Sequence, residues 1–506
     1  MPDRFCLVSV WDIIINNMVQ LNNIIGERLK KRDALKEQNI NPYPAQVKRS
    51  HTIKAALDDF DSLTEKKKKV HLVGRILLMR PYGAITFMKV ADGTGEIQFL
   101  FRKDVISGGE ETLLLNLDLG DFISGEGLLT LSKSGERTLE VENFGIAVKA
   151  LRPLPDKWHG IADVEERFRR RYLDLLMNKD VKDRFTLRSR VLNIIREQFT
   201  KDGFLEVETP ILQNVPAGAA AKPFRTHLSA LDIPLYLRIA PELYLKELLV
   251  GGFDKVFEMG RLFRNEGMDA THNPEFTSVE GYWAYQDAQG LMEYLENFVM
   301  KVLDHSGIGR STKFRDHTIK WESPIPRKTF NGLVQEYAKI DLAQANIETM
   351  EEVLIRSGHE VPAIKTEGEL CEAIFKKMCL PKLIQPVFVT EHPLALSPLA
   401  KKKDDAEVAD RFQLVVGGIE IINAYSELND PEEQRERFER SEEDISKGSA
   451  EAQLGDEDYV EALEYGMPPA AGFGIGIDRL IMLLTDSHNI REVILFPTMR
   501  PKKAGE

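Results

Sequence analysis

The sequence is poor in cysteine and in long hydrophobic runs, and each shortage excludes a class of protein. The three cysteines, Cys6, Cys371 and Cys379, neither follow a metal-site spacing nor suggest a disulfide framework. We therefore expect a reducing compartment, the cytoplasm. No stretch approaches the roughly 18 to 20 apolar residues that cross a bilayer, so we expect no membrane partner. The apolar run at 5–19 is interrupted by Asp12 and makes a poor signal peptide.

The sequence also has no excess of positive charge. Its formal net charge is −13, which argues against a protein that coats nucleic acid by bulk electrostatics, although a local basic face can still contact phosphates. A composition with 43% hydrophobic and 29% charged residues is typical of a globular protein. Because 506 residues exceed one ordinary core, we expect two or more domains.

One short segment carries groups that suit ATP binding without a Gly-rich phosphate loop. It combines residues 263–267, FRNEG, with residues 272–276, HNPEF. An Arg guanidinium grips phosphate and carboxylate oxygens through a bidentate fork, so Arg264 suits a reaction in which a carboxylate attacks a phosphate. The side chains expected to hold the adenine and the outer phosphates are Glu266, His272 and Phe276.

This segment resembles the second signature motif of class II aminoacyl-tRNA synthetases. Residues 203–210, GFLEVETP, are similar to the first motif, and residues 472–479, GFGIGIDR, are similar to the third. Together with APELYLK at 240–246, they narrow the resemblance to lysyl-tRNA synthetases of the bacterial type, and the similarity runs from about residue 20 to residue 500. An Arg followed two residues later by Glu is by itself usually a surface ion pair, so the three ordered motifs carry the identification.

Residue patterns and the resemblance together predict a multidomain α+β protein. Five alternating or apolar runs between 70 and 150, separated by turn residues, predict an N-terminal OB-fold β-barrel. The resemblance implies a class II synthetase catalytic domain built on an antiparallel sheet flanked by helices. The predicted divisions are an uncertain extension at 1–17, a helical segment at 18–65, the OB-fold anticodon-binding domain at 66–152, a linker at 153–180, and the catalytic domain at 181–506 with a helical insertion at about 308–385.

Individual elements can also be assigned from the pattern. Near-helical apolar spacing predicts an amphipathic helix over 21–38. Residues 1–17 look foreign to the rest of the chain, so one hypothesis is that translation begins at Met18, and the other is a real extension; mass spectrometry of the native N-terminus decides. The other expected elements are barrel strands at 70–78, 84–90, 96–101, 122–131 and 138–148, helices at 163–177 and 185–199, and strands at 255–259 and 415–422.

The resemblance implies a pocket for L-lysine, and the charges supply a reason. A substrate with two ammonium groups and one carboxylate needs several acidic partners and one basic partner, because breaking a buried ion pair costs about 3 to 5 kcal/mol. Glu242 and the backbone of Gly218 are expected to meet the α-ammonium, Arg264 the carboxylate, and Glu280 with Glu427 the ε-ammonium. Taken singly, a Glu is more often a surface residue. The other lysine-binding residues implied are Tyr282, Asn423 and Tyr425.

The resemblance also implies the reaction. The lysine carboxylate attacks the α-phosphate of ATP, giving lysyl-adenylate and pyrophosphate, and lysine then passes to the 3′ end of tRNA(Lys). Arg264 and Arg479 are the implied catalytic residues, with Arg479 over one face of adenine and Phe276 over the other. The G-x-G-x-G spacing at 472–476 does not fit a dinucleotide-binding fold. The full ATP-binding set implied is Arg264, Glu266, His272, Asn273, Phe276, Glu420 and Arg479.

The implied magnesium site departs from the family pattern. The family usually has two acidic residues seven apart, whereas this chain has Gln413 and Glu420. Mg2+ prefers carboxylate and phosphate oxygens, although an amide oxygen can coordinate the ion or hold a metal-bound water. We expect binding through Glu420 and ATP, with one site weakened or rearranged. A milder departure is Ala217 beside Gly218, where the family often has two glycines.

The barrel is expected to bind the anticodon, because OB-folds stack single-stranded bases on aromatic side chains. Phe87 lies where the family's stacking residue falls, with Arg80 and Gln98 as base or phosphate partners, although the pattern alone equally fits a core role for Phe87. The lysine runs at 66–69 and 401–403 are either solvated or phosphate contacts. The first motif, with Pro210 and its strand, implies a homodimer.

Three other functions remain open on the sequence alone. One is a paralogue that transfers lysine to a translation factor; it shares the catalytic motifs but lacks the barrel. Another is an aspartate or asparagine enzyme of the same subclass, although acids at both Glu280 and Glu427 would repel aspartate. The third is a catalytically silent nucleic-acid-binding or signalling protein, which the intact set of charged site residues disfavours.

Overall fold

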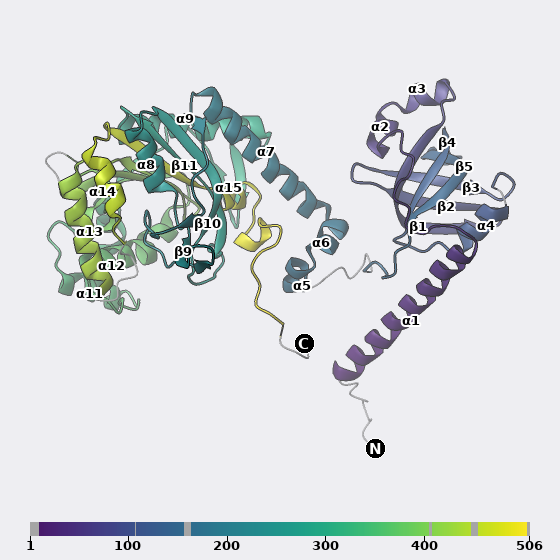
Figure 1. Cartoon of the computed structure of the whole chain (residues 1–506), viewed down its shortest axis with the longest axis horizontal. Helices are drawn as coiled ribbons and strands as arrows, with labels where there is room; N and C mark the ends of the chain where they lie inside the picture. Colours follow the sequence, from purple (N-terminus) through teal and green to yellow (C-terminus); the bar gives the residue numbers. More distant parts are fainter. Residues whose placement is uncertain (1–9, 107, 156–162, 404–406, 447–453, 503–506) are drawn as a thin grey trace, which may run out of the picture. The chain divides into compact units, whose positions relative to one another are not determined.

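The computed structural model describes residues 10–106, 108–155, 163–403, 407–446 and 454–502 (Figure 1). The chain divides into two compact units, Met1–Gly160 and Ile161–Glu506. The second unit begins before the predicted end of the linker at 180, because the helices after residue 163 pack onto it. No helix in the described part of the chain is both long and apolar enough to cross a membrane.

The first unit is built around a closed five-stranded barrel with the strand order β1-β2-β3-β5-β4. Each strand overlaps its predicted run, since alternating buried and exposed side chains are visible in the sequence. A short helix that was not predicted, α4 (Gly108–Leu115), joins β3 to β4. The barrel strands are β1 (Val70–Tyr82), β2 (Ile85–Ala91), β3 (Glu96–Arg102), β4 (Phe122–Leu131) and β5 (Arg137–Val148).

Helix α1 (Val10–Glu37) is longer than predicted and its backbone continues across Met18. Residues 1–9 lie outside the described residues, so a start at Met18 stays a prediction. The C-terminal half of α1 holds the helix to the barrel, since the Arg28 guanidinium donates to the Leu119 and Ala150 carbonyl oxygens, each at 3.0 Å, and Leu35 is fully buried. Figure 1 shows the N-terminal half leading away from the barrel. Two short helices follow, α2 (Ile53–Asp58) and α3 (Phe60–Glu65).

An eight-stranded sheet forms the centre of the second unit, in the order β14-β15-β16-β17-β18-β11-β10-β6. All neighbours are antiparallel except the pairs β14–β15 and β10–β6. This confirms the predicted fold class, a barrel followed by a largely antiparallel sheet flanked by helices. The strands are β6 (Leu205–Glu206), β10 (Lys255–Phe263), β11 (Glu275–Ala284), β14 (Arg327–Thr329), β15 (Val387–Pro393), β16 (Val408–Val416), β17 (Ile419–Ser426) and β18 (Ala470–Gly476).

The predicted single strand over 415–422 is wrong. This apolar stretch is divided by Gly417 and Gly418, which have φ of 61° and 73° and turn the chain between β16 and β17. Two consecutive residues with positive φ form a hairpin turn that glycine adopts without steric cost. The hydrophobicity on both sides masks the turn, because both strands are buried.

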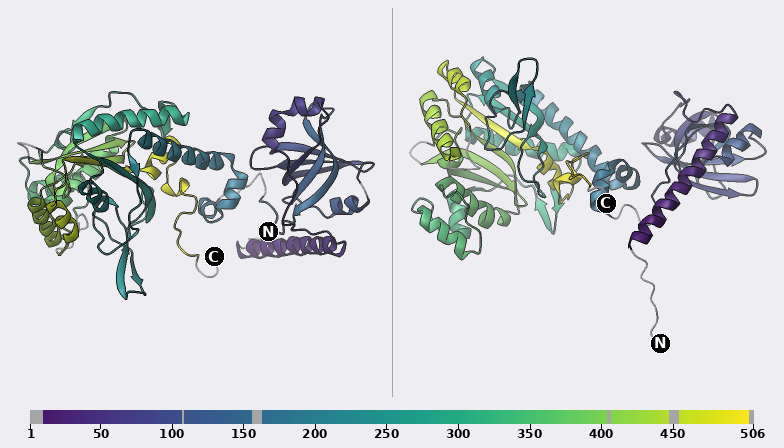
Figure 2. Two further views of the ribbon diagram at one scale, coloured as in Figure 1. Left: turned by 45° about the horizontal axis from the view of Figure 1, so that its top comes forward. Right: turned by 60° about the horizontal axis from the view of Figure 1, so that its bottom comes forward.

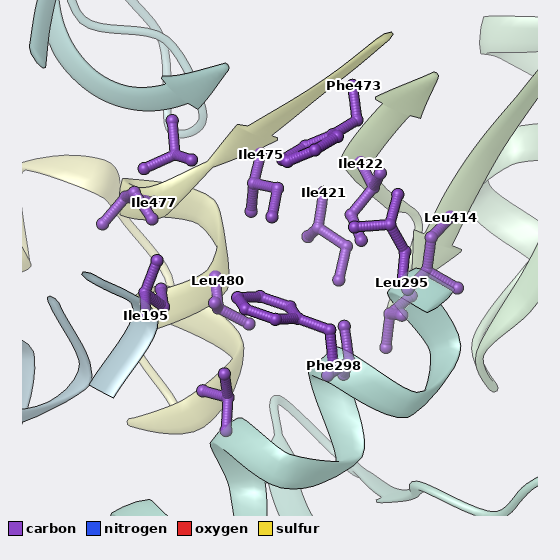
Figure 3. Close-up of a cluster of buried hydrophobic side chains, with 14 of the residues drawn as sticks. Ile195, Leu295, Phe298, Leu414, Ile421, Ile422, Phe473, Ile475, Ile477 and Leu480 are labelled. Carbon is purple, nitrogen blue, oxygen red and sulfur yellow. The ribbon is translucent and has the colours of Figure 1, made fainter. Parts of the chain in front are cut away.

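One face of the sheet is covered by α7 (Lys179–Lys201), α9 (Ala288–Ser306) and α15 (Ile477–Leu484), which share a core with it. Figure 3 shows Phe298 of α9 and Leu480 of α15 below Phe473 and Ile475 of β18. In Figure 2 the two long helices, α7 and α9, lie along this face of the sheet. Helix α9 begins where Asp287 accepts a hydrogen bond from Gly290 N at 2.7 Å, a standard N-cap.

The opposite face of the sheet carries a smaller cluster. Helices α8 (Glu242–Val250) and α14 (Glu457–Glu464) pack here through Leu245 and Tyr459, against Tyr282 of β11. Helix α13 (Pro431–Ser446) lies next to α14, with Phe438 in the same cluster. The segment that carries Glu242 and Lys246, helix α8, therefore lies on this face.

Two other regions differ in detail from the predictions. The predicted helix over 163–177 is two helices, α5 (Val164–Arg169) and α6 (Arg171–Met177), because Arg170 between them has non-helical backbone angles, φ −109° and ψ 50°. The Arg171 guanidinium then donates to the carbonyl oxygens of Arg491 and Ile494. The predicted helical insertion contains helices α10 (Phe330–Ala338), α11 (Ile347–Arg356) and α12 (Glu367–Ile374), but also a hairpin of β12 (Ser311–Phe314) and β13 (His317–Lys320). A further three-stranded sheet consists of β7 (Leu212–Gln213), β9 (Ile233–Leu237) and β8 (Arg225–Leu228).

Candidate active site

The glycines of the third motif form the floor of the site. Gly474 lies in register between Glu280 of β11 and Asn423 of β17, and Gly472 lies between Tyr282 and Tyr425. Because side chains alternate along a strand, Phe473 and Ile475 of β18 point into the core while the glycines face the site. A strip of glycine backbone in β18 is therefore flanked by polar side chains on both neighbouring strands, Glu280, Tyr282, Asn423 and Tyr425.

Gly472 tolerates no side chain. A Cβ added there would lie 2.3 Å from Glu427 Oε1 and 2.4 Å from Tyr282 Cε1. A Cβ at Gly474 would meet nothing closer than 3.7 Å, at Glu280 Cγ. The first glycine is thus required by the packing of the site residues, and the second leaves space in front of Glu280.

The three predicted glutamates come together from three separate elements. Glu242 opens α8, Glu280 lies on β11, and Glu427 directly follows β17; the exposed fractions are 7%, 8% and 1%. Tyr425 Oη donates to Glu242 Oε1 at 2.5 Å. Gly218, with φ of 90°, lies against Glu242, since a Cβ there would be 3.3 Å from Glu242 Cβ. The structure therefore gathers the predicted lysine-binding carboxylates into one buried cluster.

Burial changes the acidity of this cluster. It raises the pKa of Glu280 to about 8, with the charge of Glu242 adding to the rise and the charge of Arg264 opposing it. Burial also raises the pKa of Glu427, although the ammonium of Lys246 lowers it in part. The raised pKa values indicate that the nearby cations do not fully offset the buried negative charge. A cationic ligand can supply the missing positive charge.

One member of the cluster, Lys246, was not predicted from the sequence. Its Nζ lies 2.6 Å from Glu242 Oε1 and 2.5 Å from Glu427 Oε2, and its side chain is completely buried. Burial lowers the pKa of Lys246, but the charges of Glu242 and Glu427 outweigh this and raise it above its ordinary value. The available signal was the spacing of Glu242 and Lys246, which are four apart in the α8 sequence and therefore share a helix face.

Arg264 lies in the turn between β10 and β11. Its backbone N donates to the Pro274 carbonyl oxygen at 2.9 Å, and its guanidinium carbon lies 5.2 Å from the centre of the Phe276 ring. Burial lowers the pKa of Arg264, the charge of Glu280 raises it, and the group remains a cation. Its buried Nε has no hydrogen-bond partner among the described residues, so a donor is left for an anionic ligand.

The second and third motifs meet at His272 and Arg479. His272 Nε2 lies 2.9 Å from Arg479 Nη2, and Arg479 Nη1 donates to the Glu420 carbonyl oxygen at 3.2 Å. Asn273 shapes the loop by donating from Nδ2 to the Glu275 carbonyl oxygen at 2.6 Å. Two guanidinium groups, one from each motif, are thus available to a polyanion. Phe276 is half-buried, and Glu266 is exposed in the same loop.

The predicted metal residues, Gln413 of β16 and Glu420 of β17, contact each other directly. Gln413 Nε2 donates a short hydrogen bond to Glu420 Oε2. Among the residues that the structure describes, no group of three or more His, Cys, Asp or Glu side chains is placed to hold a metal ion. One carboxylate with an amide beside it fits Mg2+ only when phosphate oxygens supply most of the ligands.

The predicted anticodon residues share one outer face of the barrel. Arg80 of β1 pairs directly with Phe87 of β2, and Gln98 of β3 pairs with Lys89, two residues along from Phe87. Phe87 is half-buried, whereas its neighbour Met88 is fully buried in the barrel core. Gln98 Nε2 donates to Thr138 Oγ1 at 2.9 Å.

Both lysine runs make ion pairs with the protein itself. Lys69 Nζ lies 2.6 Å from Glu142 Oε2, and Lys403 Nζ lies 2.5 Å from Glu391 Oε1. A phosphate contact by either run stays a prediction.

Comparison with known proteins reveals a matching family and similar relatives. Residues 163–500 match the family described as tRNA synthetases class II (D, K and N). The chain is 44% identical over 485 residues to a lysine–tRNA ligase of Dehalococcoides mccartyi, covering 94% of this chain and 97% of the relative. Other relatives are the lysine–tRNA ligases of Carboxydothermus hydrogenoformans, 44% identical with 96% and 99% covered, and Moorella thermoacetica, 44% identical with 95% and 99% covered.

Proposed function

This chain belongs to the class II tRNA synthetases (D, K and N), and we propose that it is a lysine–tRNA ligase. The observation that carries the proposal is the buried cluster of Glu242, Glu280 and Glu427 beside Arg264. A substrate with two ammonium groups and one carboxylate matches these charges, whereas aspartate would bring further negative charge to buried carboxylates. The five-stranded barrel argues against a lysine-transferring paralogue that lacks this domain.

The residues have separate roles in the first step. Glu242 with the Gly218 backbone holds the α-ammonium, and Glu280 with Glu427 holds the ε-ammonium, while Tyr282, Asn423 and Tyr425 line the remaining wall. Arg264 orients the lysine carboxylate so that an oxygen attacks the α-phosphate of ATP as pyrophosphate leaves. Since the protein contributes positioning and charge, fixed cations matter more here than a general base.

The triphosphate lies between the two motifs in this proposal. Arg264 and Arg479 neutralise its oxygens, Phe276 stacks on the adenine, and Glu266, His272 and Asn273 border the base and the outer phosphates. When bound through Glu420, Mg2+ neutralises phosphate charge. Lysine then leaves the adenylate for a hydroxyl of the terminal tRNA ribose, which replaces the phosphate on the lysine carbonyl.

Isotope exchange between pyrophosphate and ATP tests the proposal. We expect exchange that depends on added L-lysine, with aspartate and asparagine giving only background, followed by lysine transfer to tRNA(Lys) when tRNA is added. Exchange driven by aspartate or asparagine, or an equal response to all three, would contradict the proposal.

Because Gln413 carries an amide where the family usually has an acid, restoring a carboxylate there should change the Mg2+ dependence of the reaction. Glu in place of Gln413 would set a second carboxylate beside Glu420, and hard oxygen anions favour Mg2+. We expect Gln413→Glu to lower the Mg2+ concentration for half-maximal exchange several-fold. Binding of Mn2+ to the ATP-bound protein, followed by electron paramagnetic resonance, should show tighter binding or an additional ion. An unchanged Mn2+ isotherm and Mg2+ dependence would show that the amide is equivalent to the acid.

The barrel face with Arg80, Phe87 and Gln98 is the proposed anticodon site. Base stacking on an aromatic side chain contributes about 1 to 3 kcal/mol of binding free energy. Phe87→Ala should therefore raise KM for tRNA(Lys) by the factor that corresponds to this loss. Pyrophosphate exchange, which needs no tRNA, should stay unchanged. The control is Leu131→Ala, which removes an exposed apolar side chain at a different position on the barrel. Equal effects of both substitutions on aminoacylation would contradict an anticodon role for Phe87.

We place a homodimer contact at the first motif. Pro210 itself lies in the connection after β6, outside the strands, but the residues around it expose apolar surface. Leu205, Ile211 and Leu212 have exposed fractions of 48%, 47% and 47%. Exposed apolar side chains within one short segment support association with a second copy. The substrates ATP and tRNA, with the free buried thiols of Cys371 and Cys379, support a cytoplasmic location.

A further inference from the structure

We propose that Lys246 is a positioning residue that sets the separation between the two carboxylates receiving the α- and ε-ammonium groups, and thereby selects the length of the diamino acid. The inference rests on the proposed function. Lys246 touches neither reacting carboxylate nor phosphate in that scheme. It acts through Glu242 and Glu427, which it joins.

The geometry makes Lys246 a fixed bridge. Its Nζ is 2.6 Å from Glu242 on the same helix and 2.5 Å from Glu427, which follows a strand of the central sheet. Three aromatic rings surround it, with their centres 5.6, 5.8 and 6.0 Å from Nζ, those of Tyr425, Tyr459 and Tyr282. A fully buried ammonium with carboxylates on two sides and rings elsewhere has little freedom to move. Both carboxylates are therefore held relative to one point.

The charge count supports a functional role. When all three glutamates are ionised, the state that binds a cation, they contribute −3, and Lys246 with Arg264 contributes +2, so these five side chains sum to −1. A lysine substrate with two ammonium groups and one carboxylate carries +1, which brings the site to zero. Without Lys246 the same side chains sum to −2, and buried like charges are then relieved by protonation of a carboxylate. A protonated Glu427 no longer pairs with the ε-ammonium, so substrate recognition would suffer even in a folded protein.

A bridge that fixes the two ammonium sites also allows the pocket to distinguish diamino acids by the length of their side chains. L-Ornithine has the same charged groups as lysine but one methylene fewer, so its two ammonium groups cannot both take the positions that those of lysine occupy when the two carboxylates are fixed. One methylene in an apolar pocket is typically discriminated about 10- to 200-fold. With the bridge removed, Glu427 can move toward a shorter ligand. The ratio of kcat/KM for lysine to that for ornithine therefore reports the positioning role directly.

The test compares three substitutions of Lys246 in the full-length protein by pyrophosphate exchange. Lys246→Met keeps the length without charge, Lys246→Gln keeps a donor, and Lys246→Arg keeps the charge. We expect the neutral variants to raise KM for lysine by about 10- to 100-fold, the range for groups in one charge network, and to lower the lysine-to-ornithine ratio by at least about tenfold. KM for ATP should stay near that of the wild type. Lys246→Arg should recover much of the lysine KM.

The first unit offers a matched control. Lys149 is also fully buried, with its Nζ 2.5 Å from Asp118 and 2.7 Å from Asp121. Lys149→Met breaks an equivalent buried ion cluster in the barrel unit, and thermal unfolding measures the stability loss in both cases. We expect it to leave the lysine KM and the lysine-to-ornithine ratio unchanged.

Several outcomes would overturn the proposal. One is a folded Lys246→Met or Lys246→Gln protein with the wild-type lysine KM and lysine-to-ornithine ratio. Another is a Lys149→Met protein that changes these quantities as much. If neither neutral variant folds, Lys246→Arg decides, because its charge is kept but its longer side chain alters the bridge between the carboxylates. An unchanged lysine-to-ornithine ratio in the folded Lys246→Arg protein then contradicts length selection, and loss of folding there too assigns Lys246 a structural role alone. A wild-type protein without lysine-dependent exchange would instead contradict the proposed function.

Discussion

Replacing Arg264 by methionine is expected to slow adenylate formation by about 100- to 1,000-fold, since removal of one preorganised charge stabiliser typically costs about 3 to 4 kcal/mol. Arg264 is a half-buried residue influenced by the charge of Glu280, and its buried Nε is unpaired among the described residues. In the proposed reaction it grips the attacking carboxylate and the phosphate together. The loss should therefore appear chiefly in kcat, because these contacts strengthen as the new bond forms.

Two further variants separate charge from geometry at this position. Arg264→Lys keeps the charge without the planar fork and should be intermediate. Arg261→Met removes an exposed arginine near the end of β10, the strand that leads into Arg264, and should change little. Pre-steady-state measurement of adenylate formation supplies the rates, with thermal unfolding as the check on folding. Similar kcat values for Arg264→Met and the wild type would remove Arg264 from the chemistry.

Replacing Glu280 by glutamine should weaken lysine binding by about 3 to 5 kcal/mol, the usual cost of removing one partner of a buried ion pair. Calorimetry with lysine alone measures this, since lysine binding precedes chemistry. The matched control is Glu275→Gln, an exposed carboxylate on the same strand. A Glu280→Gln protein that binds lysine as tightly as the wild type would show that Glu427 alone receives the ε-ammonium.

The raised pKa of Glu280 gives this site a pH dependence. Below about pH 8 the buried carboxyl is mostly protonated in the empty protein, and binding a cation requires the ionised form. Lysine affinity should therefore increase from pH 6.5 toward 8 and then level off, and the slope should be reduced in Glu280→Gln. The folding stability of the empty protein changes with pH in the opposite direction. A carboxyl whose pKa rises on folding from 4.5 to about 8 contributes stability at low pH, and this contribution is lost as the pH rises through this range.

Features with a local cause could be predicted from the residues alone. The five barrel strands are recognisable because alternating side chains and turn residues repeat within each strand. The G-x-G-x-G pattern indicates close backbone approach, and Gly472 indeed leaves no room for a Cβ. The hairpin at Gly417 escapes prediction because apolar residues on both sides hide a turn between two buried strands.

The family, the two-part architecture and the residue types of the site could be inferred before any coordinates, because these depend on short motifs and on periodicity along the chain. Which charges meet is a property of the folded molecule. Tyr425 and Glu242, which share a hydrogen bond, are 183 residues apart, and Lys246 joins two carboxylates from separate elements. No local pattern encodes such pairings, because they depend on strand order and register, and the energy of a buried charge depends on every group the fold places around it.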